Sequence, residues 1–199
     1  MQTFLHFSVV DKATLRTDYL DKRKSLSRSQ YWILSDQILD QVKTVDWSQF
    51  NTVHVFLPIS KYNEIDTFSV MNFFADQYPD LQVVLPRTNF STLEMEHVLF
   101  DPLLTILGRN KFDIPEPIYG RLVTADKIDA VITPLLAFDK KGSRVGYGKG
   151  FYDRFLSNCR EDVQKIGLSF FDPIEDVSDV NELDIALNQC ITPKKVWQF

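Results

Sequence analysis

Four of the chain's seven glycines lie within nine residues, in a segment that also carries two cations. Residues 142–150 read GSRVGYGKG and include Arg144 and Lys149. Glycine loses more conformational freedom than other residues when a loop is fixed, so this cluster indicates that backbone N–H groups approach an anion closely. The spacing matches neither the Walker A nor the dinucleotide-binding pattern. We predict a phosphate-binding loop, and a merely flexible loop is the alternative.

A carboxylate and a stripe of cations accompany this loop. Asp153 falls in the first turn of the helix predicted after the loop, where it can stabilise the helix dipole or bind a divalent cation beside a phosphate. Lys12, Arg16 and Arg23 share one stripe of a predicted N-terminal helix. Helical periodicity alone favours solvated surface cations for such a stripe. Both roles of Asp153 remain open from the residues alone.

Apolar segments that alternate with helical segments must position these residues. The strand candidates are largely apolar, which is typical of a parallel sheet covered by helices on both faces. Ligands of such sheets bind beyond the carboxyl ends of the strands, here the loops that begin at Pro58, Pro86, Asp139 and Phe171. We expect Pro86 to end its strand and Pro134 to split or bulge another. The predicted strands are 52–57, 81–85, 92–100, 128–138, 165–170 and 189–192, and the predicted helices are 11–26, one opened by a Ser27–Gln30 capping box, 67–78 and 151–159.

Composition narrows the class of protein. The 199 residues suit one compact domain, and the net charge of −5 argues against nucleic-acid binding. Residues 1–10 are too short and too poor in basic residues for a membrane span or a signal peptide, and no later segment is long and apolar enough to span a bilayer. Cys159 and Cys190 are expected to be reduced thiols. We predict a cytoplasmic protein without membrane contact.

The segment 137–156 (AFDKKGSRVGYGKGFYDRFL) closely resembles the signature of 5-formyltetrahydrofolate cyclo-ligases, also called 5,10-methenyltetrahydrofolate synthetases. Further matching segments occur in the family's order, so the resemblance covers nearly the whole chain. They are KATLR at 12–16, the segment 59–67 with EIDT at 64–67, IPEP at 114–117 and KIGL at 165–168.

The resemblance implies an α/β fold, a single-domain three-layer αβα sandwich with a mostly parallel, Rossmann-like sheet. It places the cyclo-ligase domain at 11–199 and leaves 1–10 as an N-terminal extension. The implied enzyme converts 5-formyltetrahydrofolate to 5,10-methenyltetrahydrofolate with ATP and Mg²⁺, and we expect a monomer or a weak dimer with small-molecule substrates only.

The family also implies roles for individual residues. Lys149 and Arg144 are the expected catalytic residues. ATP is assigned to Lys12, Arg16, Arg144, Gly146, Tyr147, Gly148, Lys149, Gly150, Phe151 and Tyr152; the folate to Ile59, Glu64, Tyr147, Gly148, Lys149, Gly150 and Phe151; and Mg²⁺ to Asp153 and Asp184.

Several positions keep alternatives open. Arg87 can meet the folate's glutamate carboxylates or form a surface ion pair, and Phe112 and Tyr152 can pack on a flat ring or in the core. Pro173, Leu183 and Asn188 depart from residues common in the family. Two other functions remain: a non-catalytic folate- or nucleotide-binding relative, and a sugar-phosphate isomerase, which would need an acid/base pair and no ATP.

Overall fold

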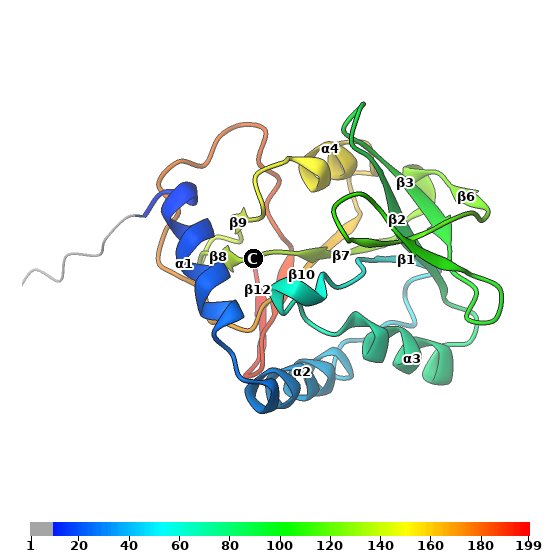
Figure 1. Cartoon of the computed structure of the whole chain (residues 1–199), viewed down its shortest axis with the longest axis horizontal. Coiled ribbons are helices and arrows are strands. Elements are labelled where there is room, and N and C mark those ends of the chain that lie inside the picture. The colour runs from blue at the N-terminus through cyan, green and yellow to red at the C-terminus, as the bar shows by residue number, and fades with distance from the viewer. Residues whose placement is uncertain (1–9) are drawn as a thin grey trace, which may run out of the picture.

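The centre of the protein is an eight-stranded sheet in the order β12-β11-β10-β7-β1-β2-β3-β6 (Figure 1). This computed structural model describes residues 10–199. The five strands from β11 to β2 run parallel, and β12, β3 and β6 pair antiparallel toward the two edges. The strands are β1 (Thr52–Val55), β2 (Gln82–Asn89), β3 (Glu94–Leu99), β6 (Leu122–Val123), β7 (Ala130–Pro134), β10 (Gln164–Leu168), β11 (Gln189–Ile191) and β12 (Val196–Gln198).

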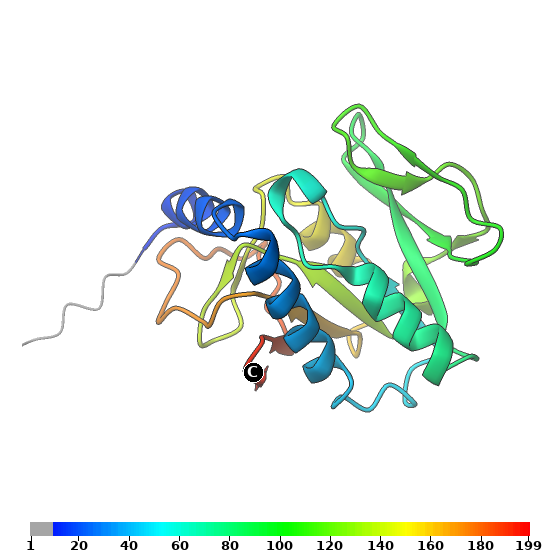
Figure 2. The same ribbon diagram turned by 60° about the horizontal axis from the view of Figure 1, so that its bottom comes forward.

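Both faces of this sheet are buried, which confirms the predicted three-layer α/β architecture. On one face, Val53 and Val55 of β1 pack in the same apolar cluster as α2 (Arg28–Val42) and α3 (Thr67–Gln77). On the other face, Val84 and Val131 pack with α4 (Phe151–Ser157). Side chains of successive strand residues point to opposite faces, so uniformly apolar strands require helices on both sides. Figures 1 and 2 show α2 and α3 on one face and α4 on the other.

The first two helices begin where the predicted caps lie. The Asp11 carboxylate accepts the Thr14 N–H at 2.7 Å and starts α1 (Lys12–Lys24), and Ser27 and Gln30 form the reciprocal capping box of α2. Lys22, Arg23 and Lys24 lie in the last turn of α1, where cations favour the helix dipole. The two caps identify the starts of these helices because each satisfies a backbone N–H that the helix itself leaves unpaired.

Two small hairpins complete the fold. The predicted strand 128–138 is split as expected, since β7 ends at Pro134 and β8 (Ala137–Phe138) pairs with β9 (Arg144–Val145) in a separate hairpin covered by α1. The proline-rich segment forms β5 (Pro115–Pro117), which pairs with β4 (Leu107–Arg109). Short 3₁₀ helices η1 (Ser60–Tyr62) and η2 (Ala125–Lys127) occupy loops.

The expectation that Pro86 ends its strand was wrong. β2 continues to Asn89, and Pro86 pairs with His97 of antiparallel β3. The register of β2 with β1 ends at the His54–Val84 pair, so a proline two residues later removes no hydrogen bond to β1. The edge strand β12 was not predicted from the sequence.

Other predictions concern the termini and thiols. Residues 1–9 of the predicted extension lie outside the described residues, while Val10 forms an isolated bridge to Val177. Both cysteines are free thiols, as predicted. Within residues 10–199, no helix has the length and apolar character needed to cross a bilayer.

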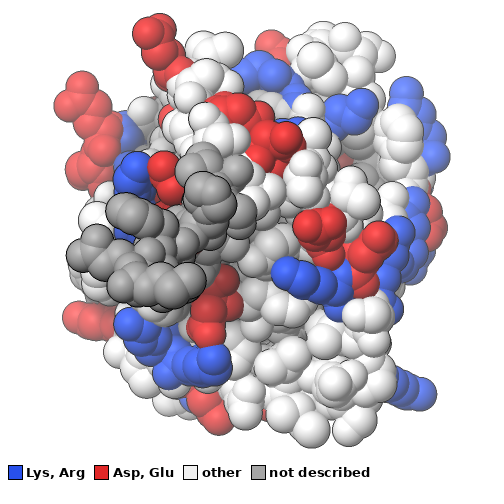
Figure 3. Space-filling view, turned by 90° about the vertical axis from the view of Figure 1, so that its left-hand side faces the viewer, with Lys and Arg blue, Asp and Glu red and all other residues white. Residues whose placement is uncertain are grey.

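On the face that carries α1, Lys and Arg lie interspersed with Asp and Glu (Figure 3).

Candidate active site

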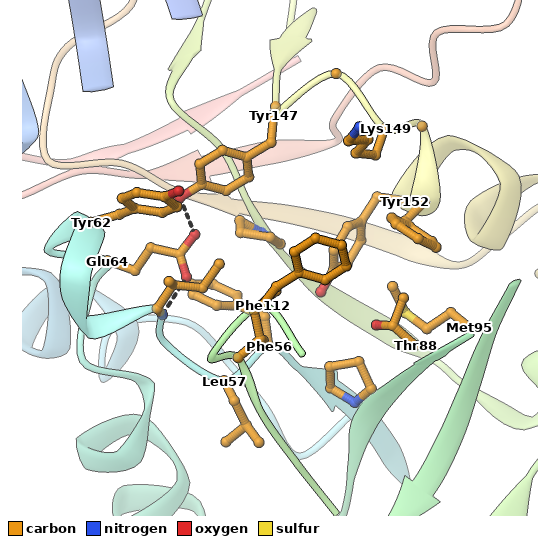
Figure 4. Close-up of a pocket in the computed structure, with 18 of the residues that line it drawn as sticks. Phe56, Leu57, Tyr62, Glu64, Thr88, Met95, Phe112, Tyr147, Lys149 and Tyr152 are labelled. Carbon is orange, nitrogen blue, oxygen red and sulfur yellow. Dashed lines mark hydrogen bonds between the residues drawn. The ribbon is translucent and has the colours of Figure 1, made fainter. Parts of the chain in front are cut away.

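A cavity of about 420 Å³ opens at the carboxyl ends of β1, β2 and β7 (Figure 4). Phe56 and Leu57 follow β1, Pro86 belongs to β2, and Pro134 ends β7. Its volume falls within the range of roughly 300–1,000 Å³ that is typical of small-molecule sites. All the residues that the family resemblance assigns to the site line this cavity: Lys12, Arg16, Ile59, Glu64, Arg144, Gly146, Tyr147, Gly148, Lys149, Gly150, Phe151, Tyr152, Asp153 and Asp184.

The glycine loop reaches the cavity through backbone conformations that favour glycine. Gly148 has φ +85° and Gly150, the residue before α4, has φ +67°. A Cβ on Gly148 would lie 3.2 Å from the guanidinium carbon of Arg16, whose Nε donates to the Gly146 carbonyl at 3.0 Å. Helix α1 therefore holds the loop from one side, and Gly148 leaves space for that contact.

The cations around the loop differ in their partners. Lys12 is buried, and its ammonium donates to the Asp184 carboxylate, so it is not the solvated surface lysine that periodicity favoured. The ammonium of Lys149 is exposed and has no hydrogen-bond or ion-pair partner among residues 10–199. Figure 4 shows the Lys149 side chain over the cavity. Lys149 is thus free to meet an anionic ligand.

A partly buried ion pair closes the end of the loop. Arg144 is 8% exposed, and its Nη2 donates to Asp153 Oδ1 at 2.8 Å, while its Nη1 donates to the Ile185 carbonyl. The Ile185 N–H also donates to Asp153 Oδ1, at 3.2 Å. Burial lowers the pKa of Arg144, and the charge of Asp153 opposes that shift. The guanidinium of Arg144 is therefore occupied by protein groups in this structure.

Asp153 and Asp184 offer the donors that a magnesium ion would need. Each lines the cavity, and each has one carboxylate oxygen that accepts no hydrogen bond from residues 10–199. No cluster of three or more His, Cys, Asp or Glu suited to a metal occurs within those residues. Protein sites commonly hold Mg²⁺ through only one or two carboxylates together with substrate phosphates and water. Two cavity carboxylates fit that ion.

Glu64 is the buried anion of the site. It is 3% exposed; its Oε2 accepts the Ile59 N–H at 2.7 Å and its Oε1 accepts the Tyr147 hydroxyl at 2.5 Å (Figure 4). Burial raises the pKa of Glu64, while the charge of Arg23, the Tyr147 hydroxyl and the Ile59 N–H lower it. Each carboxylate oxygen retains acceptor capacity, so Glu64 can receive N–H groups from a ligand.

Sequence reasoning overlooked part of this site. Arg23 is buried against Tyr62 and Tyr147, although its place on the stripe with Lys12 and Arg16 was a usable signal. Of the aromatic and sulfur-containing wall, only Phe112, Tyr147, Phe151 and Tyr152 were predicted, because core packing explains most phenylalanines equally well. The remaining members of that wall are Phe56, Tyr62, Phe90 and Met95.

Two alternatives from the sequence are decided by geometry. Arg87 does not line the cavity; its Nε donates to Glu96 at 2.7 Å, the ion pair that was one of its two expected roles. Phe112 lines the cavity, and the centroid of its ring lies 4.4 Å from that of Phe90, so Phe112 belongs to the cavity wall. Tyr152 also lines it, and its buried hydroxyl has no partner among the described residues.

A family model described as "5-formyltetrahydrofolate cyclo-ligase family" matches residues 8–193. The chain belongs to this family. A cyclo-ligase of Escherichia coli strain K12 is 36% identical over 95 residues, a match that covers 47% of this chain and only 52% of that relative. The chain thus spans about half the length of that relative. The cyclo-ligase of Mus musculus is 23% identical over 192 residues, covering 90% of this chain and 92% of the relative.

Solved structures of similar proteins agree with the fold. A 5,10-methenyltetrahydrofolate synthetase of Aquifex aeolicus superposes with a TM-score of 0.78 at 26% identity, covering 94% of this chain and 92% of the other. One from Mycoplasma pneumoniae has a TM-score of 0.70 at 24% identity, covering 92% and 99%. The three departures from the family pattern, Pro173, Leu183 and Asn188, lie outside the cavity lining of this cyclo-ligase family member.

Proposed function

We propose that this chain is an ATP- and Mg²⁺-dependent cyclo-ligase that converts 5-formyltetrahydrofolate to 5,10-methenyltetrahydrofolate and releases ADP and phosphate. One observation carries the proposal: a single cavity contains a buried carboxylate, Glu64, and a glycine loop whose cation Lys149 has no ion-pair partner among residues 10–199. The carboxylate suits the N–H donors of a pterin, and the loop suits a triphosphate.

The reaction needs activation of the formyl oxygen, which is a poor leaving group. In the proposed route the γ-phosphoryl group of ATP moves to that oxygen and ADP departs. N10 of the folate then attacks the activated carbon and loses its proton, and phosphate leaves with the former formyl oxygen. No protein nucleophile is required, so the residues must align the two substrates and neutralise charge on the phosphoryl group.

The cavity residues supply those two roles. Glu64 and Ile59 would bind the pterin, while Lys149, Arg144, Lys12 and Arg16 would surround the phosphates together with backbone N–H groups of the loop. Each charge-assisted hydrogen bond contributes on the order of 1.5–3 kcal/mol. Mg²⁺, held by Asp153 and Asp184, would neutralise phosphate charge when bound.

We further propose that the protein acts on small molecules in the cytoplasm, as a monomer or weak dimer with one domain at 11–199. The two free thiols support a reducing compartment.

The test is a turnover assay with purified protein. Absorbance of the methenyl product should rise only when 5-formyltetrahydrofolate, ATP and Mg²⁺ are all present, and omission of ATP or chelation of the metal should abolish it. Release of ADP is measured in parallel. Folate binding without product or ADP would instead support the non-catalytic alternative.

A further inference from the structure

Arg23 of α1 is a buried cation whose hydrogen bonds all go to segments around the cavity. It is 5% exposed, its Nε donates to the Tyr62 carbonyl at 2.7 Å, and its Nη1 donates to the Leu135 carbonyl at 3.2 Å. Its Nη2 donates to the Tyr147 hydroxyl and lies 3.9 Å from Glu64 Oε1. An isolated buried guanidinium would be strongly unfavourable, so these contacts fix both its position and theirs.

The direction of the hydrogen bonds from Arg23 to Glu64 follows from the groups involved. A guanidinium can only donate, so the Tyr147 oxygen accepts from Arg23. The proton of that hydroxyl is then directed to Glu64 Oε1, 2.5 Å away. Hydrogen bonds in such a chain polarise one another, which strengthens the contact to an ionised Glu64. Figure 4 shows the Tyr147 hydroxyl directed at the Glu64 carboxylate.

Arg23 is also the only cation that faces Glu64 from the described elements packed around it. The other titratable groups near Glu64 are Tyr31 of α2, Tyr147 of the loop and Tyr152 of α4. Burial raises the pKa of all three phenols, that of Tyr31 to about 12, so the phenols remain neutral over the pH range in which folate binding is measured. The charge that counters the burial of Glu64 therefore comes from Arg23.

We propose that Arg23 is a positioning residue: acting through the Tyr147 hydroxyl, it holds Glu64 in the orientation and charge state that accept the N–H groups of a pterin. The inference rests on the proposed function, since it assigns Glu64 to the folate. It predicts that removal of Arg23 weakens folate binding selectively, because Lys12 and Arg16 on the same helix keep their contacts to Asp184 and Gly146.

The experiment measures the Kd of 5-formyltetrahydrofolate by calorimetry from pH 5 to 8, with turnover and the KM for ATP in parallel. The variants are Arg23→Gln, Arg23→Lys and Tyr147→Phe, and the control is Lys22→Gln, which removes an exposed cation from the same turn. A protonated Glu64 binds a pterin poorly, so the wild-type Kd should rise toward acid pH.

Arg23→Gln should weaken folate binding at pH 7 about tenfold and move this acid limb upward by about one pH unit or more. Arg23→Lys should retain part of the wild-type folate affinity, because lysine keeps the positive charge but lacks the planar set of N–H donors of a guanidinium. Tyr147→Phe should weaken binding in the same direction and does not disturb the bonds of Arg23 to Tyr62 and Leu135. The KM for ATP should stay within about twofold of the wild-type value in Arg23→Gln.

Several outcomes overturn the inference and separate it from the proposed function. An unchanged acid limb and folate Kd in both Arg23→Gln and Tyr147→Phe would contradict it, as would equal losses for ATP and folate without a pH shift. Should Arg23→Gln fail to fold, Tyr147→Phe still breaks the connection and decides the question. Wild-type folate binding with the predicted acid limb and the predicted losses in the variants, but no turnover, would support Arg23 and overturn the cyclo-ligase proposal; absent wild-type binding would overturn both.

Discussion

At the scale of single residues, Lys149 and Asp153 lie in one cavity but in different surroundings. Lys149 is exposed without a partner among the described residues, whereas Asp153 is tied to Arg144 and Ile185. Substitution of the first should therefore affect ligands alone, while substitution of the second should affect both ligands and folding.

Lys149→Met should lower kcat/KM for ATP about a hundredfold, because a charge-assisted contact to a phosphate is lost. Its free energy of unfolding should stay within about 0.5 kcal/mol of wild type, as for other exposed sites. Steady-state kinetics and urea unfolding measure the two quantities. Lys43→Met, which removes an exposed lysine after α2, is the matched control and should keep full activity. Equal activity of the two variants would contradict the role of Lys149.

Asp153→Asn should reduce turnover on the order of a hundredfold and raise the Mg²⁺ concentration needed for half-maximal rate, because a neutral amide is a poor ligand for Mg²⁺. The asparagine oxygen can still accept from Arg144 and Ile185, so unfolding should become easier by only about 1–2 kcal/mol. Magnesium titrations of turnover test this. Asp162→Asn, at an exposed ion pair, is the control. A Mg²⁺ response identical to wild type would remove Asp153 from the metal site.

At the scale of elements, the contact between α1 and the glycine loop organises the phosphate side of the cavity. Arg16 reaches the Gly146 carbonyl and lies against Gly148. The two glycines differ in a way that experiment can exploit: Gly148 has a positive φ and little space, whereas nothing lies within 4 Å of a Cβ placed on Gly146.

Gly148→Ala should destabilise the protein by about 1–2 kcal/mol and raise the KM for ATP, because the methyl group is strained at positive φ and displaces Arg16. Gly146→Ala meets no neighbour and should change the free energy of unfolding by less than half that amount. Denaturant unfolding of the two variants gives the comparison. A larger loss of stability for Gly146→Ala would show that the loop has a different conformation.

The elements also mark how far the sequence could predict this structure. Local signals sufficed for Asp11, for the Ser27–Gln30 capping box and for the parallel core, because caps and apolar periodicity are properties of short segments. The course of β2 through Pro86 could not be predicted, since it depends on where β1 ends beside it. The role of Arg23 likewise depends on tertiary contacts, whereas the residues of the glycine loop could be assigned from a long ordered motif.

At the scale of the whole molecule, two histidines are buried between the sheet and α4. His54 and His97 lie with ring centroids 5.4 Å apart, and His97 packs 3.9 Å from the Phe155 ring. Both His54 nitrogens and His97 Nδ1 have no partner among the described residues. Burial lowers the pKa of His97 to about 4 and also lowers that of His54.

This pair should make folding stability sensitive to acid. In the unfolded chain His97 takes up a proton below about pH 6.5, whereas folded His97 takes it up only near pH 4. The contribution of His97 to the free energy of unfolding is therefore complete above pH 6.5 and is lost as the pH falls toward 4. His97→Phe should reduce the loss between these pH values by about 3 kcal/mol, measured by urea unfolding across the range. The same decline in wild type and variant would contradict the assignment.

In the proposed reaction ATP and the folate occupy one cavity, with the γ-phosphate beside the formyl oxygen. This arrangement can be tested with 5-formyltetrahydrofolate that carries ¹⁸O in the formyl group, followed by mass analysis of the released phosphate. One ¹⁸O atom should appear in the inorganic phosphate for each methenyl product formed. Label in the solvent, with unlabelled phosphate beside the same amount of product, would contradict it.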